Sequence, residues 1–100
     1  MIKIKEVKER KTVKLVKNIK VKNALGLHIR PAALIVKILQ LSKSSVFFTY
    51  KKETVNARSI MNILTLAVKK NSEITITVKG DDAAFTMEAL IEAFESCFEE

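Results

Sequence analysis

The sequence has few of the residue types from which special sites are built. Its 100 residues include one cysteine, one proline, one histidine, two glycines and no tryptophan. The single cysteine, Cys97, excludes an internal disulfide, and without a second Cys or a neighbouring His it is expected to be a small residue on a helix face. No apolar run approaches the roughly 18 residues of a membrane span, and no apolar signal core follows the basic N-terminus. We therefore expect one small soluble domain in the cytoplasm, without membrane insertion.

The positive charge lies at one end of the chain. Residues 1–22 carry nine Lys or Arg against two Glu, which accounts for the whole net charge of +7. Such an arm attracts nucleic acid or an anionic membrane through screened electrostatics. However, no aromatic residue is interleaved in it to stack bases and no nucleic-acid motif accompanies it, so nucleic-acid binding is not expected. Residues 1–15 are predicted to be a basic extension, left open between flexible chain and an added strand or turn, and residues 16–100 to be the folded domain.

The only histidine and the only proline lie together at the start of a predicted helix. The run 26–33 reads GLHIRPAA, and an apolar stretch long enough for a buried helix follows it. Pro31 is tolerated in a first helical turn because an N–H there has no intrahelical partner. The unpaired amides of that turn and the helix dipole favour an anion such as phosphate. A lone histidine before a helix is most often a cap or a surface residue, but His28, with Arg30 two residues on, is also placed to carry a phosphoryl group.

The run 23–33, NALGLHIRPAA, resembles the active-site signature of HPr, the histidine-containing phosphocarriers of the bacterial phosphoenolpyruvate:sugar phosphotransferase system. Its glycine, histidine, arginine and proline stand at the family's spacing, and the resemblance covers about residues 16–98. It implies that His28 is phosphorylated on Nδ1 by phospho-enzyme I and passes the group to EIIA components. A neutral imidazole attacks a phosphoryl group without an activating base, and Arg30 and the helix amides share its charge. The resemblance implies a monomeric carrier rather than an enzyme, with no metal and no cofactor.

Apolar spacing predicts four strands and three helices. Alternation with period two indicates strands, and i, i+3, i+4 spacing indicates helices. The expected order is a strand at 16–22, a helix at 29–41, strands at 46–50 and 54–57, a helix at 59–67, a strand at 74–78 and a helix at 83–98. Leu34, Ile35, Ile38 and Leu41 are expected to form the buried face of the first helix. Asn71 is predicted to be a left-handed stop of the second helix.

The order β-α-β-β-α-β-α predicts an α+β fold. We expect an HPr-like two-layer open-faced sandwich, in which a four-stranded antiparallel sheet carries three helices on one face. The strand order follows from the resemblance alone. It places the first strand beside the last, and the second strand between the last and the third.

Ser59 is a second candidate site, at the start of the second helix. A serine at this place is most often a helix cap. The run 55–61, VNARSIM, nevertheless resembles the segment in which an ATP-dependent HPr kinase phosphorylates a regulatory serine. A phosphate there would add nearly two negative charges. We expect phosphorylated Ser59 to weaken docking of the partner that delivers phosphate to His28.

Apolar residues near the histidine are candidates for partner docking. Adjacent residues on one helix cannot both point inward, so at least one of Ile60 and Met61 is expected to be exposed, and exposed apolar groups beside a reactive residue favour a transient interface. The resemblance implies a docking ring made of Ile29, Ala33, Ile60, Met61 and Leu64.

Two rival functions stay open at this point. A regulatory protein would act through Ser59 and its partners, with His28 idle. A nucleic-acid binder would place its affinity in residues 1–22 and lose it steeply with salt. An independent enzyme is not expected, because the chain has no acid–base pair and no second nucleophile.

Overall fold

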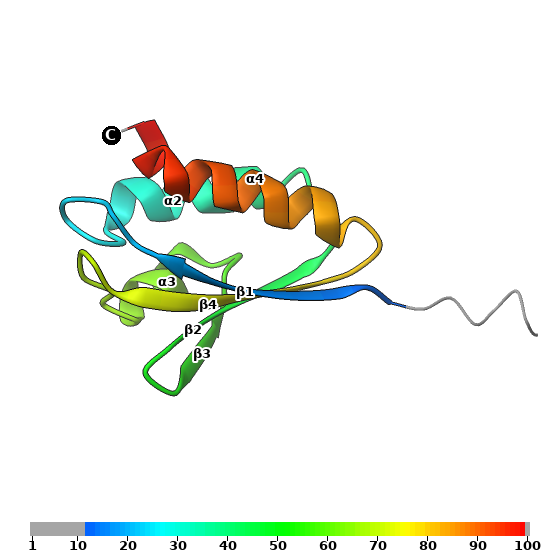
Figure 1. Cartoon of the computed structure of the whole chain (residues 1–100), viewed down its shortest axis with the longest axis horizontal. Coiled ribbons are helices and arrows are strands. Elements are labelled where there is room, and N and C mark those ends of the chain that lie inside the picture. Colours follow the sequence, from blue (N-terminus) through cyan, green and yellow to red (C-terminus); the bar gives the residue numbers. More distant parts are fainter. Residues whose placement is uncertain (1–11, 100) are drawn as a thin grey trace, which may run out of the picture.

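The computed structural model describes residues 12–99 as one layered domain (Figure 1). Its order confirms the predicted β-α-β-β-α-β-α, followed by a short 3-10 turn. The elements are β1 (Lys14–Lys20), α2 (Ile29–Leu39), β2 (Ser45–Tyr50), β3 (Glu53–Asn56), α3 (Ile60–Thr65), β4 (Glu73–Lys79), α4 (Ala83–Glu95) and η1 (Cys97–Glu99). Most of the predicted extension lies outside the described residues, and β1 begins before its expected boundary.

The four strands form one antiparallel sheet in the order β1-β4-β2-β3. This confirms the strand order that the resemblance implied. In β4, Ile74, Ile76 and Val78 are buried, whereas Thr75 and Thr77 between them are half-buried on the opposite face. The alternation that predicted the strand therefore also orients it, since successive side chains point to opposite faces.

The helices α2 and α4 lie side by side over one face of the sheet in Figure 1, and α3 packs against α2 and β3. Edge-to-face contacts between aromatic rings connect the sheet to the helices in the core between the two layers. The Phe48 ring of β2 meets the Phe94 ring of α4 with centroids 6.1 Å apart, and Phe94 meets Phe98 at 4.9 Å. The other face of the sheet carries partly exposed residues, among them Val16 and Phe47.

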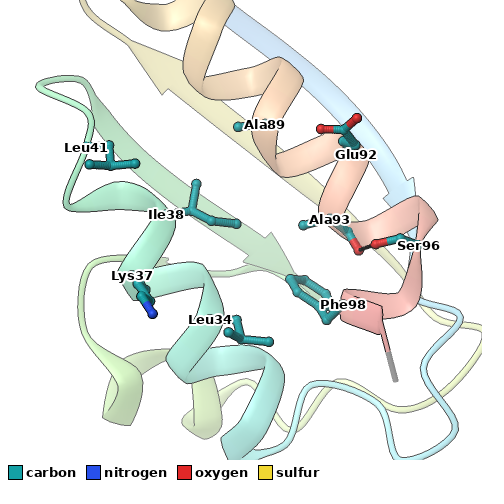
Figure 2. Close-up of a pocket in the computed structure, with 9 residues that line it drawn as sticks. All are labelled: Leu34, Lys37, Ile38, Leu41, Ala89, Glu92, Ala93, Ser96 and Phe98. Carbon is teal, nitrogen blue, oxygen red and sulfur yellow. Dashed lines mark hydrogen bonds between the residues drawn. The ribbon is translucent and has the colours of Figure 1, made fainter.

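The buried face of α2 differs from the predicted one. The helix ends at Leu39, and its fully buried apolar positions are Ala32, Ile35 and Leu39. Leu41 is 77% exposed, so its assignment to the core was wrong. Leu41 and Ile38 are among the residues that line a groove between α2 and α4 (Figure 2), and the volume of this groove is about 600 Å³.

The second helix, α3, is shorter than predicted. It covers Ile60–Thr65, and the left-handed residue that follows it is Ala67, with φ of 52°. Asn71 has a positive φ of 72°, but it lies in the turn before β4, where its N–H donates to the Val21 carbonyl at 2.7 Å. The prediction of Asn71 as the helix stop was therefore wrong.

The last helix also ends early. α4 ends at Glu95. After Ser96, the residues Cys97 and Phe98 have positive φ values of 53° and 54°. This reversal folds Phe98 back against Phe94 and leaves its side chain only 5% exposed. Cys97 thus belongs to a turn after the helix, and its predicted place on a helix face was wrong.

Candidate functional site

The loop before His28 is held by backbone contacts to the segment after α3. The Gly26 N–H donates to the Asn23 carbonyl at 3.0 Å, and the Leu27 N–H donates to the Val68 carbonyl at 3.0 Å. Gly26 has φ of +68°, and a Cβ atom built on it would lie 2.1 Å from the Val68 carbonyl oxygen. Only glycine fits this left-handed, close approach. The loop therefore fixes the chain direction immediately before the histidine.

His28 is the N-cap residue of α2. Its backbone is extended, with φ of −92° and ψ of −168°, and its carbonyl accepts the first helical N–H, that of Ala32, at 3.1 Å. Within the described residues its side chain makes no capping hydrogen bond to the helix. The first turn holds no acidic residue, and Pro31 there is buried. The imidazole therefore lies at a helix N-terminus without forming a capping hydrogen bond to the helix. The helix dipole favours negative charge at this end.

A pocket of about 190 Å³ opens beside the imidazole. Its lining residues come from the loop, the first turn of α2 and the C-terminal turn: Asn23, Leu25, His28, Arg30, Pro31, Cys97 and Phe98. The structure thus brings together His28 and Arg30, the two residues for which the sequence indicated phosphate chemistry. The Arg30 side chain is exposed, so its guanidinium is accessible to an incoming anion.

Of the seven residues that line this pocket, sequence reasoning named only His28 and Arg30 as site residues. Asn23 is only the first residue of the motif, Cys97 was predicted to lie on a helix face, and Phe98 was predicted only as the end of the last helix. No glycine marks the reversal at Cys97, so no local signal pointed to it. The burial of Asn23, which is 1% exposed, is set by the tertiary structure, so the sequence alone did not indicate its role.

Ser59 is the N-cap residue of α3. Its Oγ accepts the Asn62 N–H at 3.2 Å, which is the capping role that a serine most often has at this position. The side chain is half-buried. The residue therefore stabilises the helix start in its unmodified form.

Arg58, beside Ser59, fastens α3 to the end of α2. Its guanidinium donates three hydrogen bonds of 2.7 Å, to the carbonyls of Leu39, Ser42 and Ser44. The carbonyls at a helix C-terminus have no intrahelical donors, and a cation there is favoured by the dipole. Nothing in the run 55–61 indicated this role of Arg58.

The predicted docking residues lie on α2 and α3, which pack against each other. Ile29 is 67% exposed and Met61 is 70% exposed, and Ala33 is exposed as well. Ile60 and Leu64 are half-buried and pack against the core. An exposed apolar pair therefore lies on the two helices that begin with His28 and Ser59.

Among residues 12–99, no group of three His, Cys, Asp or Glu is arranged to hold a metal ion. No helix in this part of the chain is long and apolar enough to cross a membrane.

Comparison with known proteins identifies the family. A family model described as the PTS HPr component phosphorylation site matches residues 15–96. The chain belongs to the HPr family. HPr proteins are phosphocarriers of the phosphotransferase system, which implies transfer between protein partners of that system.

Individual relatives agree with this assignment. The phosphocarrier protein HPr of Chlamydia muridarum (strain MoPn / Nigg) is 45% identical over 80 residues, which cover 80% of this chain and 77% of that protein. The crystal structure of HPr from Thermoanaerobacter tengcongensis matches with a TM-score of 0.83 at 36% identity, covering 86% of this chain and 97% of that one. The HPr-like protein Crh of Halalkalibacterium halodurans is 40% identical over 79 residues, 79% of this chain and 94% of that protein.

Proposed function

We infer that this chain accepts a phosphoryl group on His28 from phospho-enzyme I and passes it to EIIA components of sugar uptake. The observation that carries the proposal is the placement of the imidazole. His28 is the N-cap residue of α2, its side chain makes no capping hydrogen bond among the described residues, and it shares a pocket with Arg30. The protein acts in the cytoplasm as a monomeric carrier, with no metal or cofactor.

The transfer needs only groups that the site already holds. The lone pair of Nδ1 attacks phosphorus while the bond between phosphorus and the donor's nitrogen breaks, and the donor imidazole leaves with that electron pair. Arg30 donates charge-assisted hydrogen bonds to the phosphoryl oxygens, and the N-terminus of α2 adds partial positive charge. Positioning and charge stabilisation account for most catalysis of phosphoryl transfer.

Docking of both partners uses the apolar ring of Ile29, Ala33, Ile60, Met61 and Leu64. The exposure of Ile29 and Met61 supports this, since large exposed apolar groups beside a reactive side chain mark interaction sites. Because both partners need the same histidine, they compete for this surface and bind in turn.

The direct test is phosphorylation with phosphoenolpyruvate and a general enzyme I. Intact mass and peptide mapping should find one acid-labile phosphoryl group on His28 and none on the His28→Ala variant. The histidine is unique in the chain, so the location is unambiguous. Failure to accept phosphate from an enzyme I that charges another HPr would overturn the proposal.

Ser59 is proposed as a regulatory site for an HPr kinase. Phosphorylation would place nearly two negative charges at the start of α3, beside the exposed Met61. We expect Ser59→Asp to raise the KM for enzyme I several-fold, because the charge disfavours an apolar contact. Ser59→Ala is the matched control, and it should transfer at the wild-type rate. A Ser59→Asp variant as fast as wild type would remove this part of the proposal.

A mainly regulatory protein is the second candidate. The 40% identity to a protein named HPr-like protein Crh favours it. In that case Ser59→Ala would abolish binding to regulatory partners, whereas His28→Ala would leave it unchanged. The phosphorylation test above separates the two candidates.

A further inference from the structure

The C-terminal turn forms one wall of the pocket beside His28. Cys97 and Phe98 line this pocket, although they follow the histidine by about 70 residues. The Phe98 ring is 5% exposed and packs edge-on against Phe94, between α2 and the end of α4 (Figure 2). The accessibility of the imidazole therefore depends on whether this turn stays closed.

The backbone of the turn is intrinsically disfavoured. Cys97 and Phe98 both lie in the left-handed region, with φ of 53° and 54°, and neither is a glycine. Residues with a Cβ atom adopt this region only when surrounding contacts over-determine it. The turn thus relies on the contacts that hold it closed.

One of these contacts comes from the histidine loop. The Asn23 Nδ2 donates to the Cys97 carbonyl at 3.1 Å, across 74 positions of sequence. Asn23 is 1% exposed, and its Oδ1 has no hydrogen-bond partner among the described residues. A buried acceptor without a partner is unfavourable, so packing alone would be served better by an apolar side chain of similar size. The polar residue at this position therefore points to a role in holding the turn.

We propose that Asn23 is a positioning residue for His28. By binding the Cys97 carbonyl it keeps the C-terminal turn closed against the histidine loop, and the closed turn limits the access of water to phosphorylated His28. In the competing hydrolysis, the oxygen of water bonds to phosphorus, the P–N bond breaks, and the proton from water moves to the ring nitrogen. Asn23 thus prolongs the lifetime of the phosphorylated carrier between donor and acceptor. The inference rests on the proposed function.

The test compares the half-life of phosphohistidine in Asn23→Leu with that in wild type, both charged by enzyme I and freed of donor. Leucine has a similar size and removes the Nδ2 donor together with the unpartnered Oδ1. Loss of a hydrogen bond worth about 1 kcal/mol opens the turn about fivefold more often, so the half-life should fall by up to about fivefold. The urea midpoint should stay close to that of wild type, because the loss of one hydrogen bond is destabilising whereas the removal of one unsatisfied acceptor is stabilising.

Thr86→Val is the matched control. Thr86 is also 1% exposed, and its hydroxyl lies 2.6 Å from the Ser42 Oγ. Thr86 belongs to the first turn of α4, at the opposite end of that helix from the C-terminal turn. This variant loses a buried hydrogen bond elsewhere, so its stability should fall while its phosphohistidine half-life stays unchanged. A merely structural role of Asn23 predicts the same behaviour for Asn23→Leu.

The outcomes separate the two proposals. Wild type that takes up no phosphate overturns the carrier function and this inference with it. Wild type that is charged normally, with an unchanged half-life in Asn23→Leu, overturns the inference alone. If the leucine variant does not fold, Asn23→Ala measured well below its melting temperature serves the same comparison. Here a half-life equal to that of Thr86→Val would refute the role.

Discussion

Removal of the Arg58 guanidinium should loosen the joint between α2, β2 and α3. Arg58→Met keeps an unbranched stem but loses three hydrogen bonds of 2.7 Å to main-chain carbonyls. Each hydrogen bond from a charged group contributes about 1.5–3 kcal/mol. The sum overstates the loss, because Arg58 is partly exposed and water replaces the guanidinium at these carbonyls. We expect the free energy of unfolding to fall by about 2–3 kcal/mol, which for a domain of this size lowers Tm by about 8–24 °C.

Urea unfolding followed by circular dichroism measures this loss. Arg58→Lys should lose about 1–2 kcal/mol, because a single ammonium cannot reach three carbonyls at once. Lys70→Met, in an exposed turn, is the control and should change the free energy of unfolding by no more than about 0.5 kcal/mol. Amide exchange should rise at 42–44, where two of the three carbonyls lie. An Arg58→Met variant that loses less than about 0.5 kcal/mol would refute this account of the joint.

Three further predictions concern single positions. Gly26→Ala should lower the free energy of unfolding by about 2 kcal/mol or more, because its Cβ would meet the Val68 carbonyl at a positive φ, and urea unfolding at wild-type strength would contradict this. Lys52→Gly should raise the free energy of unfolding by about 0.5–1 kcal/mol, since Lys52 has φ of 72° in a two-residue hairpin turn, and an unchanged Tm would argue against strain there. Hydrogen bonds from the Ser44 hydroxyl and the Lys43 N–H hold the pKa of the Asp82 carboxyl below its usual value. Because this pKa is lower in the folded than in the unfolded protein, the stabilisation is present above about pH 4 and is lost as the pH falls further. Urea midpoints between pH 2 and pH 7 should therefore drop less in Asp82→Asn than in wild type, and parallel curves would exclude this contribution.

The local sequence pattern was sufficient to predict an element where its buried residues recur with a single period. The strict alternation in β4 and the proline after His28 located a strand and a helix start that the structure confirms. The sheet order required the family resemblance, because β1 and β4 are far apart in sequence and alternation carries no information about partners. Of the site, the sequence named His28 and Arg30, which lie in one pocket.

The errors arose where tertiary contacts decide. α2 carries apolar residues on several faces, so more than one set of residues fits the helical period. Leu41 lies beyond the end of the helix at Leu39, where that period no longer applies. Nothing in the last six residues signals a reversal, and the turn at Cys97 forms because Phe98 packs on Phe94 and Asn23 binds the chain. Contacts of this range are invisible to a local reading.

The hydrogen bond between Asn23 and Cys97 has a consequence for synthesis on the ribosome. The two residues are 74 positions apart, so the histidine loop emerges long before the chain that closes its pocket. The sheet has the same dependence, because β4 separates β1 from β2 and is made after both. N-terminal segments generally leave the ribosome first, at about 5–20 residues per second. A nascent or interrupted chain would therefore expose His28 without the C-terminal turn that lines its pocket. The pocket beside His28 would be complete only when translation has passed Phe98.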